Sequence, residues 1–204
     1  MSRIVRMLVV AASMLFAAVS SVAVGSPATA VPKNDLNDHL AAVWTTILEL
    51  PNPENPYSEG PPFLCLDLDG VVAPFAPFGV DPSCTVKPGT KLFVIASSYE
   101  CSSFEGHGST EPVLRACAKE ADADVAPVVT LDGETVPVME VETPLLEIVL
   151  PADNLFGRPA GSEGLSVGHG WVALLHPLTP GSHTIFIDSD EAATTTTIVV
   201  APRS

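Results

Sequence analysis

The stretch VVTLDGETVPVMEV, residues 128–141, contains the clearest structural signal in the chain. Its first four residues are apolar or β-branched, Asp132-Gly133 follows, and a second extended run continues to Val141. Asp-Gly between two such runs is typical of a β-hairpin, because both residues accept the positive φ angles that a tight hairpin turn needs. This part of the chain is therefore predicted to be all β.

Further extended segments lie on both sides of this hairpin. Prolines and glycines recur every few positions between residues 60 and 88, so only short strands fit there. The whole pattern predicts a mainly β fold, namely a Greek-key β-sandwich of immunoglobulin-like or jelly-roll-like type. The apolar or β-branched runs that we expect to be strands are 91–97, 145–150, 171–176, 183–187 and 194–200.

Two helices are expected as additions to the sandwich. Asn34 or Asp35 is a suitable N-cap for an N-terminal helix that runs to about Glu49 and has one apolar face. Thr110 is a suitable cap for a short mid-chain helix, whose body is expected at 113–121.

Particular residues are predicted to build the core. Trp44 lies on the apolar face of the N-terminal helix and is expected to be buried. Trp171, Leu174 and Ile185 belong to expected strands and are predicted to lie in the sandwich core. Gly181 is predicted to turn one strand into the next, at a position that other residues avoid if its φ is positive.

The composition is that of a compact acidic protein. The 204 residues carry a formal net charge of −15, from 9 basic and 24 acidic side chains, and 47% of the residues are hydrophobic. The hydrophobic fraction excludes a wholly disordered chain, and the length fits one domain. The negative charge excludes nonspecific nucleic-acid binding, which needs a surplus of Lys and Arg, and disfavours docking on anionic lipid.

Residues 1–30 have the pattern of a signal peptide for export. Arg3 and Arg6 precede the apolar run 7–18, and Ala28-Thr29-Ala30 has small residues at the positions that signal peptidase reads. These features predict cleavage near residue 30.

A retained transmembrane helix is the alternative, because the uncharged run 7–25 is just long enough to span a bilayer. The serines in this run weaken that interpretation, and 23–25 offers a second cleavage site. We therefore expect a single secreted domain over residues 31–204, with no membrane attachment after cleavage.

Four cysteines follow, namely Cys65, Cys84, Cys101 and Cys117. An even number in an exported chain indicates two disulfide bonds, for which three pairings exist. Pairing Cys65 with Cys84 and Cys101 with Cys117 is favoured, since each bond then closes a short loop rich in Pro, Gly or Ser. A metal site is disfavoured, because no pair has C-x-x-C spacing and no histidine stands at ligand spacing beside a cysteine.

The segment Leu66-Asp67-Leu68-Asp69-Gly70-Val71 resembles the nucleophile motif of the haloacid dehalogenase phosphohydrolases. The resemblance implies a phosphorylated aspartate at Asp67, an acid/base at Asp69 and Mg²⁺ beside them. The prolines between Asp69 and Lys91 leave no room for the helical crossover of a parallel sheet, so this activity is only the alternative hypothesis. The residues that imitate the family's later motifs are Ser97, Lys119, Asp188 and Asp190.

The segment Gly164-Leu165-Ser166-Val167-Gly168 matches the G-x-S-x-G nucleophile elbow of serine hydrolases. That elbow must follow a strand and begin a helix. Here the motif lies in 151–170, a glycine-rich stretch interpreted as a long loop, and no histidine follows the acids that come after Ser166. Serine hydrolase chemistry is therefore not expected.

A binding surface is considered at Trp171, His169, His176 and His183. His176 and His183 flank the corner at 177–181 and are expected to face each other, either as a two-histidine metal site or, preferably, in hydrogen bonds to loop backbone. Trp171, with His169 and the glycine-rich stretch, would form a ligand-binding face if its ring were exposed.

Acidic clusters occur at Asp67/Asp69, Asp122/Asp124 and Asp188/Asp190/Glu191. None has the spacing of a twelve-residue Ca²⁺ loop, so we interpret them as solvated turns. No metal and no cofactor is expected.

Six segments of the chain form a recognisable set: Asn55-Pro56, SCTVKPGTKLF (83–93), Glu100-Cys101-Ser102, LRACA (114–118), LPADNLFG (150–157) and GWVALLHPLTPGSHTI (170–185). Together they resemble a family of secreted actinobacterial proteins that has no assigned activity, over about residues 34–200. The resemblance implies export and one common architecture, and it carries no catalytic residue across.

The sequence as a whole favours a secreted, disulfide-stabilised, non-catalytic protein that acts as an extracellular binding or structural module. Its expected partner is an extracellular protein or a glycan. The alternative is a Mg²⁺-dependent phosphohydrolase that uses Asp67 and Asp69.

Overall fold

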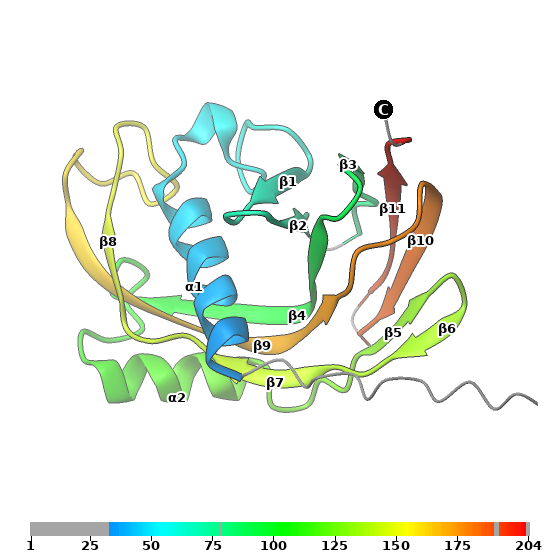
Figure 1. Cartoon of the computed structure of the whole chain (residues 1–204). Coiled ribbons are helices and arrows are strands. Elements are labelled where there is room, and N and C mark those ends of the chain that lie inside the picture. The colour runs from blue at the N-terminus through cyan, green and yellow to red at the C-terminus, as the bar shows by residue number, and fades with distance from the viewer. Residues whose placement is uncertain (1–32, 78, 190–191, 203–204) are drawn as a thin grey trace, which may run out of the picture. The chain divides into compact units, whose positions relative to one another are not determined.

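The computed structural model describes residues 33–77, 79–189 and 192–202 (Figure 1). Its helices α1 (Lys33–Glu49) and α2 (Glu111–Ala121) confirm the two predicted helices, and a short 3₁₀ helix, η1 (Asn52–Glu54), follows α1. The predicted signal peptide, residues 1–30, lies outside the described residues, as do Asp190 and Glu191. The strands are β1 (Leu64–Asp67), β2 (Val71–Phe75), β3 (Ser83–Val86), β4 (Lys91–Ser102), β5 (Val128–Leu131), β6 (Glu134–Val136), β7 (Met139–Glu142), β8 (Leu146–Val149), β9 (Glu163–Leu175), β10 (Gly181–Asp188) and β11 (Ala193–Val200).

The larger sheet is built around the long antiparallel pair of β4 and β9. Its strand order is β1-β2-β4-β9-β7, and β8 also pairs with β9. The β4–β9 register runs from Leu92 opposite Leu175 to Ser102 opposite Ser166 and shifts at a bulge between Ile95 and Ser97. The pair β2–β4 is parallel, and the other pairs of this sheet are antiparallel.

The smaller sheet has the order β3-β11-β10-β5-β6, with β3 parallel to β11 and the other pairs antiparallel. Buried Ile185 and Ile187 on β10 alternate with exposed residues, and so do Ile198 and Val200 on β11. This period of two is expected for strands that have one face in the core.

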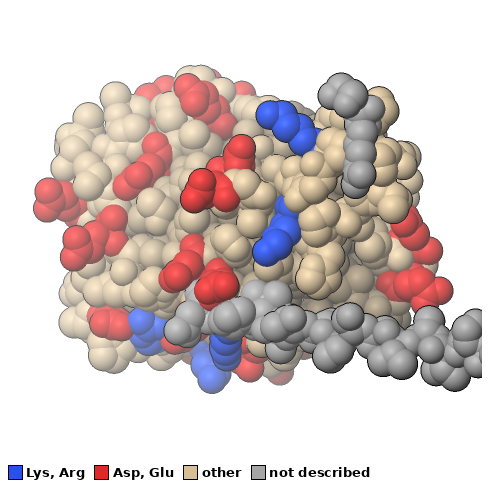
Figure 2. Space-filling model, in the orientation of Figure 1, with Lys and Arg blue, Asp and Glu red and all other residues tan. Residues whose placement is uncertain are grey.

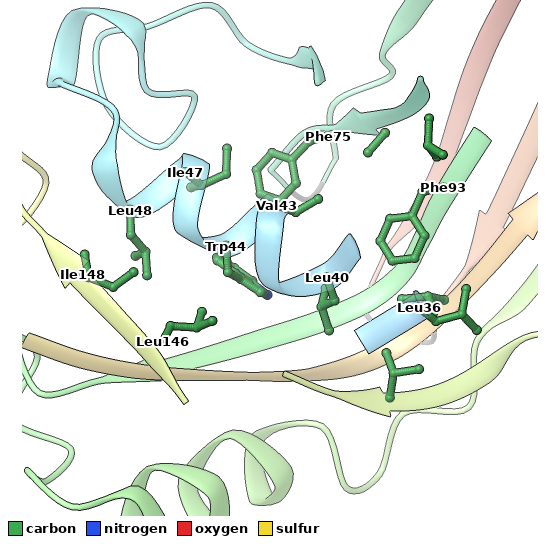
Figure 3. Close-up of a cluster of buried hydrophobic side chains, with 14 of the residues drawn as sticks. Leu36, Leu40, Val43, Trp44, Ile47, Leu48, Phe75, Phe93, Leu146 and Ile148 are labelled. Atoms are coloured by element: carbon green, nitrogen blue, oxygen red, sulfur yellow. The ribbon is translucent and has the colours of Figure 1, made fainter. Parts of the chain in front are cut away.

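Helix α1 covers one face of the larger sheet (Figure 3). Its buried positions recur at helical spacing, and Trp44, which is 6% exposed, confirms the prediction that this side chain is core. The cluster comprises Leu36, Leu40, Val43, Trp44, Ile47 and Leu48 of α1, packed on Val71, Ala73, Phe75, Phe93, Val141, Leu146, Ile148 and Val172 of the sheet, with Phe104 and Leu150 from adjoining loops.

The opposite face of the larger sheet carries the smaller sheet at one end and α2 at the other (Figure 1). Leu92, Val94 and Ala96 of β4 pack with the inward residues of β3, β5, β10 and β11. Beyond the bulge, Cys101 of β4 packs with Leu114 and Ala118 of α2. The molecule is thus a mainly β, two-sheet sandwich with two added helices, as the sequence predicted.

The structure corrects two predicted elements. The predicted hairpin is present, but its second strand ends at Val136, and residues 139–142 pair with β9 in the larger sheet. Pro137 has no N–H to continue the ladder, so the chain leaves one sheet and joins the other. The second correction is at 163–170, which belongs to strand β9 and not to a long loop.

The two disulfide bonds follow the predicted pairing. Cys65–Cys84 links β1 of the larger sheet to β3 of the smaller sheet, with a Cα–Cα distance of 5.8 Å. Cys101–Cys117 links β4 to α2, with a Cα–Cα distance of 6.1 Å. Each bond therefore joins two layers of the fold.

The remaining core predictions are confirmed in part. Ile185 is completely buried, whereas Trp171 and Leu174 are only partly buried and pack against the edges of the two large apolar clusters. Gly181 begins β10 with a φ of 138°, as expected for a turn that other residues avoid. None of the helices among the described residues is long and apolar enough to cross a membrane.

Candidate functional site

A hollow of about 420 Å³ lies between α1, the end of β4 and three loops. This volume is in the range of small-molecule sites. We call the hollow the aromatic pocket, and its lining residues are Trp44, Ile47, Leu48, Tyr57, Ser98, Tyr99, Glu100, Glu105, Leu155 and Phe156.

Glycines on β9 allow Trp44 to lie directly against the sheet at this place. A Cβ atom on Gly168 would lie 2.5 Å from Trp44 Cδ1, and one on Gly170 would lie 2.4 Å from the Ser97 carbonyl oxygen. A Cβ atom on Gly164 would lie 2.3 Å from Phe104 Cζ. Both distances to rings are shorter than contacts between carbon atoms allow, so this face of β9 requires glycine.

The aromatic side chains of the pocket are held by defined contacts. The Trp44 indole N–H donates to Ser98 Oγ at 2.9 Å, and the Ser98 hydroxyl donates to the His169 carbonyl oxygen at 2.8 Å. Tyr57 packs edge-on against Phe75, with ring centroids 5.8 Å apart, and Phe156 stacks on Phe104 at 5.1 Å. The lining is therefore preorganised.

Glu100 brings a largely buried carboxyl group into this lining. It lies opposite Gly168 in the β4–β9 register, and the Ser166 hydroxyl donates a hydrogen bond to its Oε1. The pKa of Glu100 is raised to about 7, mainly by burial and also by the neighbouring charge of Glu105, whereas the hydrogen bond from Ser166 acts in the opposite direction. Burial, together with the Glu100 charge, also raises the pKa of Tyr57 to about 12.

Glu105 is the second carboxyl group of the aromatic pocket and is more exposed. Its Oε2 accepts a hydrogen bond from the Ser102 hydroxyl at 3.2 Å and lies 3.4 Å from His107 Nδ1. Among the residues that the structure describes, the lining contains these two acids and no lysine or arginine. The view in Figure 2 likewise shows acidic side chains spread over the surface and few basic ones. The pocket therefore favours a positively charged occupant.

A second hollow, of about 560 Å³, lies between the N-terminal part of α1, α2 and β7. We call it the polar pocket. Its lining includes three basic residues, Lys33, Arg115 and Lys119, and three acidic residues, Asp38, Glu140 and Glu142. Arg115 already pairs with Glu111 at 2.5 Å and with Glu142 at 2.6 Å, so much of this charge is neutralised within the protein.

His169 lies at the wall of the polar pocket, in a buried network. Its Nδ1 lies 3.1 Å from Asp122 Oδ2, its Nε2 lies 3.1 Å from Glu140 Oε1, and the Ser97 hydroxyl donates to Asp122 Oδ1 at 2.9 Å. The hydrogen bond to Asp122 is the largest cause of a raised pKa of His169, and burial opposes it. The favoured imidazolium form donates from both ring nitrogens and joins β9 to β7 and to the end of α2.

The other candidates for a binding surface lie apart from both pockets. His183 bonds through Nδ1 to Asp132 Oδ2 at 2.7 Å and donates from Nε2 to the Thr179 carbonyl oxygen at 2.9 Å. The bond to Asp132 is the main cause of its raised pKa. His176 is exposed, and no contact among the described residues joins it to His183. The sequence favoured hydrogen bonds to loop backbone over a two-histidine metal site, and His183 makes such a bond to Thr179.

The residues of the phosphohydrolase resemblance occupy different places. Asp67 ends β1, and Asp69 lies in the turn to the antiparallel strand β2, with Asp67 Oδ1 accepting the Gly70 N–H at 3.0 Å. Ser97 is buried against Asp122, Lys119 lines the polar pocket, and Asp188 ends β10 in the smaller sheet. No hydrogen bond or ion pair in the described part of the chain joins any two of these five, and Asp190 lies outside it.

Ser166, from the G-x-S-x-G match, lies inside strand β9 and donates to Glu100. Neither Glu100 nor Asp122 is among the site residues predicted from the sequence. Glu100 lies in the serine-rich segment 97–103, beyond the predicted apolar strand 91–97, so no sequence pattern marks it as a pocket residue. Asp122 was interpreted as part of a solvated turn, whereas it is 2% exposed.

The chain matched no protein-family model, and no curated protein matched it significantly.

Proposed function

We propose that this protein is a secreted, non-catalytic binding module whose aromatic pocket takes an organic cation, such as a quaternary ammonium group or a protonated amine with an apolar body. The observation that carries the proposal is a pocket lined by aromatic rings and two carboxyl groups, with no basic residue among its described lining.

Charge complementarity supports a cation. Glu105 supplies a partly exposed carboxylate, and Glu100 supplies a buried carboxyl group that a cation would hold in its ionised form. An anionic ligand would meet repulsion from both groups and from the net charge of −15. A neutral ligand would leave the buried charge of Glu100 unpaired whenever that group is ionised.

The apolar part of the lining supports an organic ion over a metal ion. Trp44, Tyr57 and Phe156 offer aromatic surface, which attracts a cation by about 0.5–1 kcal/mol at an exposed site and by about 2 kcal/mol when desolvated. Ile47 and Leu48 offer aliphatic surface for the body of the ligand. Among the described residues, no group of three potential metal ligands lies in this pocket.

The proposal also includes export from the cytosol and a Greek-key connection of the strands. Two disulfide bonds, one of them between the sheets, suit an oxidising compartment outside the cytosol. The chain changes sheets between β2 and β3, β3 and β4, β4 and β5, β6 and β7, and β9 and β10, which supports a Greek-key arrangement of immunoglobulin-like or jelly-roll-like type.

The test compares choline with 3,3-dimethylbutanol, which has the same shape and no charge. The chain has two tryptophans, so a Trp171→Phe variant leaves Trp44 as the reporter of the pocket. We expect choline to change Trp44 fluorescence in a saturable way and the neutral analogue to bind at least about tenfold more weakly, a difference of about 1.4 kcal/mol.

Matched variants locate the binding. Glu100→Gln and Glu105→Gln should each weaken choline binding about tenfold, while Glu140→Gln, in the polar pocket, should leave it unchanged. Equal affinity for choline and its neutral analogue would overturn the proposal, and so would indifference to both pocket variants. Saturable binding of simple sugars without binding of choline would also overturn it, in favour of a glycan module.

A further inference from the structure

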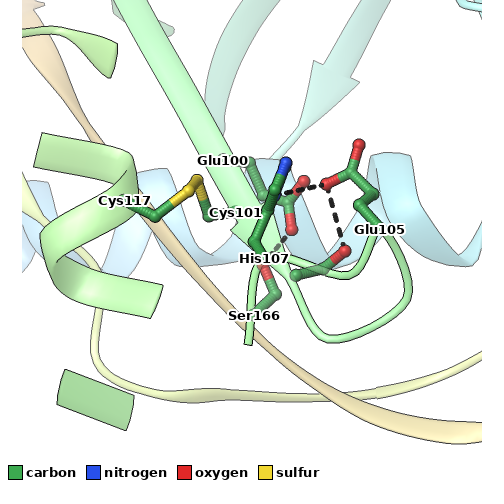
Figure 4. The surroundings of a disulfide bond; sticks show 7 residues. Glu100, Cys101, Glu105, His107, Cys117 and Ser166 are labelled. Carbon is green, nitrogen blue, oxygen red and sulfur yellow. Dashed lines mark hydrogen bonds and ion pairs between the residues drawn. A yellow bond between two sulfur atoms is a disulfide. The ribbon is translucent and has the colours of Figure 1, made fainter. Parts of the chain in front are cut away.

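The Cys101–Cys117 disulfide has a histidine beside it that linear spacing did not reveal. The two sulfur atoms and a ring nitrogen of His107 all lie within 4.8 Å of one another. Figure 4 shows His107 between the disulfide and Glu105, on the loop that follows β4. Two thiolates and an imidazole at this separation are the ligand set of a zinc site, except that the sulfurs are bonded to each other.

Glycine conformations fix the loop that carries His107. Gly106 has a φ of 82° and Gly108 a φ of 136°, values that other residues avoid. A Cβ atom on Gly108 would lie 2.5 Å from Val113 Cγ1, so the loop passes close against the first turn of α2. The position of His107 is thus set by backbone geometry on both sides of it.

We propose that reduction of the Cys101–Cys117 bond creates a zinc site from Cys101, Cys117 and His107, and that reoxidation by a small-molecule disulfide, which accepts the two electrons and becomes two thiols, releases the metal. A dithiol reductant supplies two electrons and two protons to the disulfide and becomes a disulfide itself. Zn²⁺ then binds the two sulfurs as thiolates and displaces both thiol protons. The fourth tetrahedral position is left for water.

The surroundings favour such a site. The Cα atoms of the two cysteines are 6.1 Å apart, on the sheet and on α2, so the sulfurs need only separate by side-chain rotation to reach Zn–S distances of about 2.3 Å. Glu105 Oε2, 3.4 Å from His107 Nδ1, is placed to orient the imidazole as carboxylates do behind zinc-ligating histidines. Cys117 is partly exposed, which gives a reductant access to one sulfur.

The zinc site would also replace the disulfide as the link between α2 and β4. The disulfide ties α2 to β4, and zinc would tie the same two elements in the reduced protein. The other disulfide, Cys65–Cys84, forms no such group with a third ligand among the described residues, so it is the internal control.

The experiment titrates Zn²⁺, and Co²⁺ as a coloured substitute, into the full chain before and after reduction by a phosphine. The oxidised protein should bind neither ion at this place. The reduced protein should bind one ion per chain and show the sulfur-to-cobalt charge-transfer absorption of thiolate ligands. Circular dichroism of the same samples reports whether the chain is folded.

Variants assign the ligands. Cys65→Ser/Cys84→Ser should retain the metal site after reduction, and Cys101→Ser/Cys117→Ser should lose it. His107→Ala should weaken binding at least about tenfold, and Glu105→Gln about tenfold, the scale of a partner that orients a ligand. A reduced, folded chain without thiolate-bound cobalt would overturn the proposal. So would binding that is unchanged in His107→Ala, or a reduced chain that unfolds and that zinc does not restore.

Discussion

At the scale of single residues, the surroundings of three ionisable side chains in the interior decide whether each of them carries a charge. Asp122, His169 and Glu100 each lie within the β-sandwich or beneath a helix, where a charge is costly unless it is paired. Asp122 and His169 pair with each other, whereas Glu100 has a hydroxyl group as its hydrogen-bond donor and another acid nearby. The first arrangement raises the pKa of His169 and so favours its imidazolium form, and the second raises the pKa of Glu100 and so favours a neutral acid.

Replacing Asp122 by Asn should lower the pKa of His169. The Asp122 contact is the largest cause of the raised pKa, and burial, which remains in the variant, lowers it. The stability that this pairing contributes is fully present below about pH 6.5, the unfolded value, and is lost as pH rises through the raised folded pKa. NMR titration of the His169 ring should show the shift. Glu140→Gln should give a smaller one, and an unchanged His169 pKa in Asp122→Asn would contradict this assignment.

Replacing Glu100 by Gln should change the pH dependence of stability. Because the folded pKa of about 7 exceeds the ordinary value of 4.5 for a glutamate, the protonated acid contributes stability that is fully present below pH 4.5 and is lost as pH rises to 7. The loss amounts to about 3 kcal/mol, since one pKa unit corresponds to about 1.4 kcal/mol.

Urea denaturation at several pH values measures this loss with the disulfide bonds intact. Wild type and Glu100→Gln should have similar stability near pH 4, and the variant should be the more stable protein at pH 8. Parallel curves for the two proteins across that range would show that Glu100 ionises as freely in the folded state as in the unfolded one.

Strand β9 is the element whose role differs most from its sequence pattern. Positions 164, 168 and 170 are glycines on one face of the strand, and they make room for Phe104, Trp44 and the backbone of Ser97. Trp44 also lines the aromatic pocket, so this glycine face lies next to that pocket. Glycine clusters usually indicate loops, so local propensity predicted the wrong structure here. These glycines are in a strand because they pack against Trp44 and Phe104, which are distant in the sequence. A local sequence pattern cannot show such packing.

The elements that sequence did predict have local causes. The apolar face of α1, the Asp132-Gly133 turn and the strands at 183–187 and 194–200 each follow from residues close together along the chain. The pairing of Glu100 with Ser166, and of His169 with Asp122, depends on the register of β4 against β9 and on the end of α2. The candidate site was therefore less predictable than the fold.

Gly170→Ala and Gly164→Ala should destabilise the protein to different degrees. The new Cβ at Gly170 would meet the Ser97 carbonyl oxygen and the Ser98 backbone, which cannot move without disturbing β4. At Gly164 it would meet the ring of Phe104, which can rotate away. Overpacking of this kind costs about 1–3 kcal/mol, with Gly170→Ala at the upper end. Thermal unfolding of both variants measures the order, and the reverse order would mean that β4 yields more easily than the ring.

At the scale of the whole molecule, the two disulfide bonds define how the layers are joined. The intact protein should have a mass four hydrogens below that of the reduced chain and no free thiol among Cys65, Cys84, Cys101 and Cys117. Peptide mapping without reduction should link Cys65 to Cys84 and Cys101 to Cys117. A peptide joining Cys84 to Cys101 would place β3 and β4 differently from the arrangement described above.

Removing either disulfide should cost a similar amount of stability, although the two bonds join different layers. Their sequence separations are 19 and 16, and loop-closure entropy for loops of this length predicts about 3 kcal/mol for each. Cys65→Ala/Cys84→Ala should nevertheless unfold in one cooperative transition, because the sheets share a core that includes Leu92, Val94 and Ile198. Urea denaturation followed by fluorescence and by circular dichroism tests both points. If the two signals separated in this variant alone, the inter-sheet disulfide would be what makes the sandwich a single cooperative unit, and the shared apolar core would be insufficient on its own.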